Sequence, residues 1–412
     1  MAAQVKTDAF RAFRNRNYAL FFVGQSISQI GTWMQRTAVS WVIYTLTHSA
    51  FMLGVAVFAQ QFPSFLLSLF GGIVADRHSR YKILLITQTA SMVQAILLAV
   101  LILMHHYVVW EILALSIVLG IINAFDVPAR QPMVHEMVND KEDIANALAL
   151  NSAMVNIARL VGPALSGIVL QTLGAGICFS LNAISFVAVI TSLLMMRLPK
   201  FNPPAVKKKI MHELYEGFEY LKQTPSISIV LLMLAFLSLL VLPYDTIVPV
   251  FAKVIFKGDA ATYGYISSFM GLGAIVGSLF MASVKRGANL KIILLVSSAI
   301  LGAGLICFSL FNSFSAAMPF AVLIGFGSLA PMTASITIVQ LEAASHMRGR
   351  VMSYLAMSFF GMLPLGSLLI GTISQKITAP TTMLCQGIIA LIIVAVFSRY
   401  LKGKPDKKDA VE

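Results

Sequence analysis

Long apolar blocks, separated by short polar segments, make up most of the chain. No charged residue occurs in 83–104, 112–125, 227–244 or 292–340. A helix needs about 20 mostly apolar residues to cross the hydrocarbon core of a bilayer. The blocks reach this length and are apolar nearly throughout. A soluble amphipathic helix, in contrast, is apolar along one face only. The pattern therefore predicts an all-α integral membrane protein.

Twelve blocks are long enough to form transmembrane helices. We predict helices at 18–46, 50–75, 82–104, 109–127, 145–171, 176–197, 226–252, 262–284, 290–311, 315–341, 348–374 and 380–401. They form an N-terminal half, 1–197, and a C-terminal half, 226–401, followed by a charged tail at 402–412.

Residues 198–225 connect the two halves. Three lysines, Lys207 to Lys209, precede apolar residues at helical spacing. These residues are Ile210, Leu214, Phe218 and Leu221. The segment predicts a linker that contains an amphipathic helix on the inner leaflet.

Charge and composition agree with a membrane protein. Of all residues 58% are hydrophobic and 11% are charged, whereas a soluble domain has roughly a quarter charged. The net charge of +13 would suggest a nucleic-acid partner in a soluble protein. Here 25 of the 30 Lys and Arg fall in the segments that are inside if the N-terminus is inside. We therefore predict cytoplasmic termini and no nucleic-acid partner.

The two halves repeat each other. The segment 36–39 matches 245–248, and single positions match at similar offsets. The pairs are Gly54 with Gly264, Lys82 with Lys291, Gly120 with Gly325 and Gly167 with Gly371. Two parallel, pseudo-symmetric six-helix bundles, related by an axis along the membrane normal, describe the fold of the major facilitator superfamily.

A charged loop follows the second predicted helix. Its residues are Gly72, Asp76, Arg77, Arg80 and Lys82. Their spacing resembles the signature loop of the major facilitator superfamily. A glycine lets two membrane helices approach closely, and an aspartate can face the positive N-terminal end of a helix. The resemblance implies that Asp76 faces the eleventh helix and that the loop closes the inner side of a transporter.

A second series lies in the fourth and fifth predicted helices. It contains Asp126, Pro128, Arg130 and Gln131, then 145–148, then Arg159, Gly162, Pro163 and Gly167. The series resembles the branch of the superfamily that contains the enterobactin exporter and the macrolide-efflux proteins. Gly162, Pro163 and Gly167 also resemble part of the helix-5 antiporter motif. The resemblance implies export of a siderophore or an amphipathic drug, most simply driven by protons.

Asp126 is expected near the C-terminal end of its helix, where a negative charge is unfavourable. Arg130 lies four residues later and could compensate it. We expect a structural role at the inner gate ahead of a direct role in coupling.

Polar residues recur along the first predicted helix. Gln25, Gln29, Thr32 and Arg36 are three or four residues apart, so they share one face. Such a face is expected to line a wet cavity. Asn123 could contact the substrate, or it could bond a neighbouring helix, as buried amides commonly do.

Arg159 lies midway along the fifth predicted helix, with no acidic residue within a turn. An ionisable residue in a membrane helix is costly and usually functional. We expect Arg159 to face the cavity and attract an anionic substrate or an acid from another helix.

Arg36 and Asp245 occupy equivalent positions in the two repeats. At about 1.5 Å per residue both are expected at similar depth. We predict that they form an outer gate, which protonation of Asp245 would open; the alternative is a static pair that satisfies two charges.

Other classes of function have little support. The sequence contains neither a phosphate-binding loop nor a His-Glu-x-x-His motif, and its cysteines lack metal-ligand spacing. We therefore expect no enzyme, cofactor or metal site. The prediction is a monomeric exporter of a small molecule in the bacterial cytoplasmic membrane, working by proton antiport. Uptake, and less so a sensor, remain alternatives.

Overall fold

The computed structural model describes residues 10–105, 108–138, 140–198, 210–285 and 287–401. Every regular element in these ranges is a helix, which confirms the predicted fold class. The chain forms two compact units. Unit 1 contains residues 1–48, 59–205 and 258–268, and unit 2 contains 49–58, 206–257 and 269–412.

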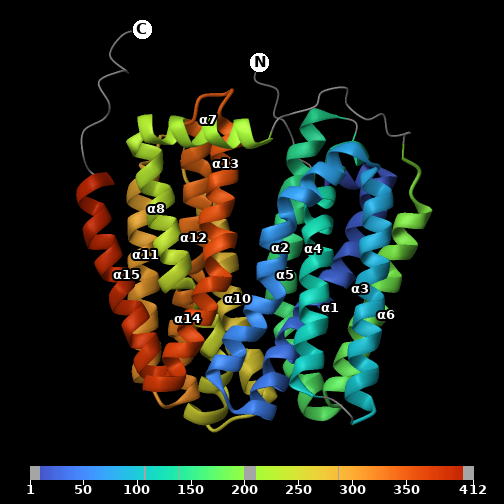
Figure 1. Ribbon diagram of the computed structural model, residues 1–412, viewed down its shortest axis with the longest axis vertical. Coiled ribbons are helices and arrows are strands. Elements are labelled where there is room, and N and C mark those ends of the chain that lie inside the picture. Colours follow the sequence, from blue (N-terminus) through green and yellow to red (C-terminus); the bar gives the residue numbers. More distant parts are fainter. Residues whose placement is uncertain (1–9, 106–107, 139, 199–209, 286, 402–412) are drawn as a thin grey trace, which may run out of the picture. The chain divides into compact units, whose positions relative to one another are not determined.

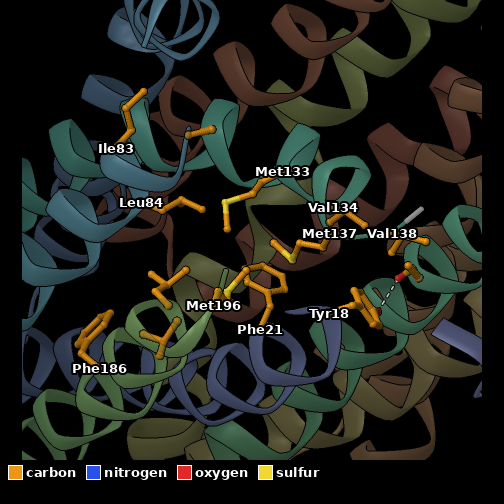
Figure 2. Close-up of a cluster of buried hydrophobic side chains, with 14 of the residues drawn as sticks. Tyr18, Phe21, Ile83, Leu84, Met133, Val134, Met137, Val138, Phe186 and Met196 are labelled. Carbon is orange, nitrogen blue, oxygen red and sulfur yellow. Dashed lines mark hydrogen bonds between the residues drawn. The ribbon is translucent and has the colours of Figure 1, made fainter. Parts of the chain in front are cut away.

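Unit 1 is built around an apolar core. Its elements are η1 (Arg11–Arg14), α1 (Arg16–Thr47), most of α2 (Ala50–Arg77), α3 (Arg80–Leu103), α4 (Val109–Met137), α5 (Lys141–Thr172) and α6 (Ala175–Met195). Figure 2 shows Phe21, Leu84 and Met133 among the side chains that form this core. The buried Tyr18 hydroxyl donates to the carbonyl oxygen of Ala147 at 2.9 Å, so the core also satisfies its polar group.

Unit 2 contains the remaining elements. They are α7 (Ile210–Gln223), α8 (Pro225–Leu240), η2 (Leu242–Ile247), α9 (Val248–Val250), η3 (Phe251–Ile255), most of α10 (Ala260–Ser283), α11 (Leu290–Leu310), α12 (Phe314–Glu342), α13 (Arg348–Ala356), η4 (Met357–Gly361), α14 (Met362–Ile377) and α15 (Ala379–Leu401). The predicted helix 348–374 is thus one stretch in which η4 is a π-helical turn between α13 and α14.

Eleven helical stretches in the described ranges are long and apolar enough to cross a membrane. The long helix that is not among them is α1, which has 32 residues. Its row of Gln, Ser, Thr and Arg side chains lowers its hydropathy. The predicted number of twelve is therefore met approximately, with α1 as the helix whose polar side chains need a wet or protein environment.

The amphipathic helix expected between the halves is present as α7. Figure 1 shows α7 lying across the ends of α8 and α13. Leu221 is 8% exposed and belongs to an apolar cluster with Ile227 and Val351. An ion pair of 2.6 Å joins Glu216 to Arg350. Leu221 therefore packs against protein, and the position of the helix on the inner leaflet stays a prediction.

Glycine contacts repeat in the two units. In unit 2, a Cβ on Gly371 would lie 3.1 Å from the Cα of Gly54. In unit 1, a Cβ on Gly167 would lie 3.1 Å from the Cα of Gly264. The sequence repeat pairs Gly54 with Gly264 and Gly167 with Gly371, so the same close helix crossing is built twice. Small residues permit such close approach of membrane helices.

α4 continues to Met137, ten residues beyond the end predicted at 127. Pro128 and Pro132 lie inside it, and each removes one backbone donor. The added segment places Met133, Val134 and Met137 in the core of unit 1. Burial of these side chains offsets the loss of two hydrogen bonds.

The predicted helix 226–252 is interrupted in unit 2. α8 ends at Leu240, and Pro243 and Asp245 lie in the 3-10 segment η2. A 3-10 turn rises about 2.0 Å per residue instead of 1.5 Å, so the α-helical rise assumed for Asp245 does not apply within η2; the similar depth of Arg36 and Asp245 stays a prediction. The cause of the interruption is Pro243, which has no N–H to continue the α-helical ladder.

Candidate functional site

The polar row on α1 is not uniform. Gln25 is 2% exposed, whereas Gln29, Thr32 and Arg36 are half-buried. The Thr32 hydroxyl donates to the carbonyl oxygen of Ser28 at 2.9 Å. Three of the four predicted residues are therefore partly accessible, and Gln25 is enclosed by protein.

A chain of buried amides, which the sequence prediction missed, lies in unit 1. The Gln35 amide donates to Gln94 at 3.0 Å, and Asn182 donates to Gln35 at 2.8 Å. The Gln94 amide donates to the carbonyl oxygen of Leu115 at 3.2 Å. These bonds join α1, α3, α6 and α4. The available signal was Gln94, one of two glutamines in the apolar helix 82–104.

Two arginines meet one tryptophan in unit 1. The guanidinium carbon of Arg36 lies 5.2 Å from the Trp33 ring centroid, and that of Arg159 lies 5.8 Å from it. A cation over an indole face is stabilised by the ring quadrupole. The structure thus brings together two of the residues predicted as substrate or coupling candidates, through an aromatic residue that the sequence prediction did not single out.

The residues of the helix-5 motif position α5. A Cβ on Gly162 would lie 2.5 Å from the Cβ of Trp33 on α1, and Gly167 approaches the start of α10. Pro163 lies inside α5 and is buried. In the structure, the motif allows α5 to pack closely against α1 and against the start of α10. A role in antiport stays a prediction.

Asp126 is buried between α3 and α4, with 3% exposure. Its carboxylate accepts from Thr87 at 2.9 Å and from Gln88 at 2.8 Å. Arg130 forms an ion pair with it at 3.0 Å. The position predicted for Asp126, near the end of its helix, is wrong because α4 continues to Met137. The i,i+4 compensation by Arg130 is present, and Pro128 does not prevent it.

In the charged loop, the predicted glycine is not the one that makes the close helix contact. A Cβ on Gly72 would meet nothing within 4 Å, whereas one on Gly71 would collide with the backbone of Ala124. Gly71 therefore permits the close approach of α2 and α4 that was assigned to Gly72. Gly72 has no close-approach role within the described residues.

The charges of this loop connect α2, α3 and α4. The Asp76 side chain is 72% exposed and lies 3.9 Å from Arg80. Arg80 forms a closer ion pair, of 2.6 Å, with Glu136, and Arg77 is exposed. Glu136 was not predicted, because α4 was expected to end before it. In unit 2, Lys291 and Glu342 form a pair of 3.0 Å at the equivalent ends of α11 and α12.

Two further candidates lie one in each unit. Asn123 is half-buried on α4 in unit 1, and Asp245 is half-buried in η2 of unit 2. Arg36 belongs to unit 1, so the gate formed by Arg36 and Asp245 stays a prediction. Within the described residues, no group of three or more His, Cys, Asp or Glu could hold a metal ion.

Comparison with known proteins adds a family. The model of a family described as transmembrane secretion effectors matches residues 7–411. A staphyloferrin A transporter of Staphylococcus aureus is 26% identical over 395 residues, covering 94% of this chain and 98% of that protein. The enterobactin exporter EntS of Shigella boydii serotype 18 is 23% identical, covering 93% of each. The multidrug efflux pump Tap of Mycolicibacterium fortuitum is 22% identical, covering 87% and 90%.

Solved structures show the same fold. The nucleoside transporter NupG superposes with a TM-score of 0.71 at 16% identity, covering 94% of this chain and all of that one. A bacterial homologue of the human lysosomal transporter Spinster superposes with a TM-score of 0.71 at 14% identity, covering 93% and 97%. At these identities the likeness establishes the fold alone.

Proposed function

The chain belongs to the transmembrane secretion effector family of the major facilitator superfamily, and on that premise we propose that it exports a small organic molecule by alternating access. It is a multi-pass membrane protein of a transporter family and not an enzyme. Two of the relatives are named as an exporter and an efflux pump, which supports export as the direction.

The observation that carries the proposal is the presence of a charged residue, Arg159, inside unit 1. Arg159 lies within the membrane span 143–172 of α5, close to the half-buried polar residues of α1. An ionisable residue at such a depth is expensive and is by default functional. Candidate substrate contacts are Gln29, Thr32, Arg36 and Arg159, and the relatives support a siderophore-like or drug-like substrate.

Protons are the proposed driving ion. Asp245 is a half-buried carboxylate in a helix that Pro243 interrupts, so it has both a titratable group and a locally irregular backbone. We place both termini in the cytoplasm, the protein in the bacterial cytoplasmic membrane, and the working unit at one chain.

The inner gate is proposed to involve the charged loop and Asp126. Asp76, Arg77, Arg80 and Glu136 connect the ends of three helices, and Asp126 with Arg130 fixes α3 against α4. If α3 and α4 tilt relative to each other, the Arg80–Glu136 pair must break. If the pair stays intact, the two helices must move as one.

The test uses inside-out membrane vesicles that contain the chain. A labelled siderophore should accumulate in the vesicles when their lumen is acidified, and a protonophore should abolish the accumulation. Asp245→Asn should transport without the dependence on the pH gradient. Accumulation only in right-side-out vesicles would instead establish uptake, and accumulation that ignores the pH gradient would exclude proton antiport.

A further inference from the structure

The first helix of the second repeat is interrupted where α8 passes into η2. The Tyr244 N–H donates to the carbonyl oxygen of Val241 at 3.3 Å. This is the bond of a 3-10 turn, whereas an α-helix would direct the same N–H to Leu240. Pro243 has no N–H, so it cannot donate to Leu239. The carbonyl oxygens of Leu239 and Leu240 have therefore lost the backbone donors that a continuous helix would give them.

One side chain of α15 binds at this interruption. The amide nitrogen of Gln386 donates to the carbonyl oxygen of Val241 at 3.1 Å and to that of Leu240 at 3.4 Å. Gln386 is 1% exposed, so its amide is closed off from bulk water. The side chain thus supplies a donor where the backbone lacks one, and it ties α15 to the start of η2.

The oxygen of the same amide is left without a donor. The Gln386 Oε1 is buried, and none of the described residues donates a hydrogen bond to it. A buried acceptor in this condition is costly. An apolar side chain of the same length would avoid that cost and fill the same space. The N–H groups of Gln386, and not its packing, therefore explain a glutamine at this position.

The first repeat has an amide at the equivalent position but uses it differently. Asn182 on α6 precedes Gln386 by 204 residues, the offset that also relates Gly167 to Gly371. The Asn182 amide donates at 2.8 Å to the side chain of Gln35, which lies on the continuous helix α1. In unit 2 the equivalent amide binds backbone at an interruption. The role of Gln386 therefore follows from the interruption and not from the repeat.

We infer that Gln386 is a positioning residue for Asp245. Its N–H groups fix the start of η2, and η2 carries Asp245. The inference rests on the proposed function, in which Asp245 binds the driving proton. Without Gln386, the passage from α8 to η2 would depend on the single 3-10 bond between Tyr244 and Val241, and the surroundings of the Asp245 carboxylate would change.

The charges near η2 leave Asp245 as the carboxylate that such a movement affects. The elements packed against η2 are α8, α9, α14 and α15. Their ionisable residues, with those of η2 and the following η3, are Tyr244, Asp245, Lys253, Lys376, Cys385, Arg399 and Tyr400. Among the described residues of these elements, Asp245 is thus the one carboxylate. Arg399 lies thirteen residues from Gln386, which is about 20 Å along a helix.

The first measurement is hydrogen exchange of the purified full chain in detergent. Gln386→Met removes the N–H donors and keeps the length of the side chain. The amides of 244–248 should exchange about 10-fold faster in this variant, as expected for the loss of one to two buried hydrogen bonds, and those of α1 should not change. The melting temperature should stay close to that of the parent, because removal of the unpaired oxygen offsets the lost bonds. Unchanged exchange in 244–248 overturns the inference.

The second measurement follows Asp245 itself. Dicyclohexylcarbodiimide modifies protonated carboxyl groups in apolar surroundings, and mass spectrometry quantifies the modified peptide as a function of pH. The pH midpoint for Asp245 should shift in Gln386→Met by about 0.5 unit or more, a threefold change in the protonation equilibrium. An unchanged midpoint, or an equal shift at Asp126 in unit 1, overturns the inference. So does an Asp245 that is unreactive at every pH in the parent, since Gln386 would then have no titrating carboxylate to position.

Thr382→Val is the matched control. Thr382 lies one turn before Gln386 on α15, is 1% exposed, and donates to the carbonyl oxygen of Thr378 in its own helix. This variant should match the parent in both measurements, and a shift as large as that of Gln386→Met overturns the inference. If Gln386→Met is not recovered folded, Gln386→Asn replaces it. Its shorter amide should give smaller changes in the same direction, and parent values would again overturn the inference.

Neither measurement uses a gradient or a transported molecule. A shifted midpoint at Asp245 supports the positioning role even if the vesicle assay shows uptake or transport without pH dependence. Conversely, parent values in Gln386→Met together with proton-driven export would remove the role of Gln386 and leave the proposed function intact. Failure of the inference and failure of the proposed function are thus separate results.

Discussion

At the scale of single residues, the approach of α2 to α4 depends on one of two adjacent glycines. Gly71→Ala should destabilise the protein by about 1–3 kcal/mol, because the new methyl group would collide with the Ala124 backbone. Gly72→Ala should change stability by less than about 0.5 kcal/mol, since its Cβ position is open. Thermal unfolding of the purified variants in detergent measures both. Equal melting temperatures would contradict the assignment of the contact to Gly71.

Asp126 is a buried carboxylate of unit 1 with three side-chain partners. Asp126→Ala would leave Arg130 without its carboxylate and Thr87 and Gln88 without their acceptor. Breaking a buried pair in this way costs about 3–5 kcal/mol, so we expect a strongly lowered melting temperature.

The matched control is Asp76, whose carboxylate is exposed. Asp76→Asn should change stability by about 1 kcal/mol or less, yet it should lower the rate of transport if the loop works as a gate. Stability is read by thermal unfolding and transport by the vesicle assay. Full transport by Asp76→Asn would remove the gating role, and a stable Asp126→Ala would show that the buried pair is not structurally important.

At the scale of elements, α7 is held to unit 2 by the apolar cluster of Leu221 and by the Glu216–Arg350 pair. Leu221→Ala should destabilise the docking of α7 by about 2–3 kcal/mol, because Leu221 is nearly fully buried in its cluster. Phe218→Ala, on the same helix, removes a ring that is 47% exposed and should have little effect.

Hydrogen exchange of the α7 amides measures this difference. Faster exchange in Leu221→Ala than in Phe218→Ala is the expected result. The reverse order would mean that α7 is held mainly through its outer face, by the lipid surface. The Glu216–Arg350 pair remains in both variants, so the comparison isolates apolar packing.

At the scale of the whole molecule, the predicted orientation can be tested by labelling. Cysteines at Asn202 and Asp406, which lie outside the described residues, should react only with reagents that enter the cytoplasm. A cysteine at Lys257 should react from outside in intact cells. The reason is the concentration of Lys and Arg in the predicted inner segments. Outside labelling at Asn202 would exclude two six-helix halves with an internal linker.

The repeat is also a property of the whole molecule. Glycines that correspond in the two halves of the sequence make corresponding contacts, Gly54 with Gly371 and Gly264 with Gly167. The ion pairs Arg80–Glu136 and Lys291–Glu342 likewise join the third and fourth helices of each repeat. One arrangement of helices has therefore been built twice from different side chains.

The sequence alone determined the membrane class, nearly all helix positions and the repeat. These follow from properties that each segment carries by itself, because an apolar stretch of a given length must cross a bilayer as a helix whatever surrounds it. It also identified Arg36, Arg159 and Asp126 as unusual, because a charged residue in an apolar stretch is evident from the sequence without any structure.

Only the tertiary structure decided what those residues contact. It extended α4 through Pro128 and Pro132, because buried partners offset two missing hydrogen bonds. It assigned the close contact to Gly71 and not to Gly72, because consecutive residues of a helix face different directions and therefore meet different neighbours. It brought two arginines from different helices, Arg36 and Arg159, to the ring of Trp33. Each of these depends on contacts between segments distant in sequence, which no periodicity or composition records.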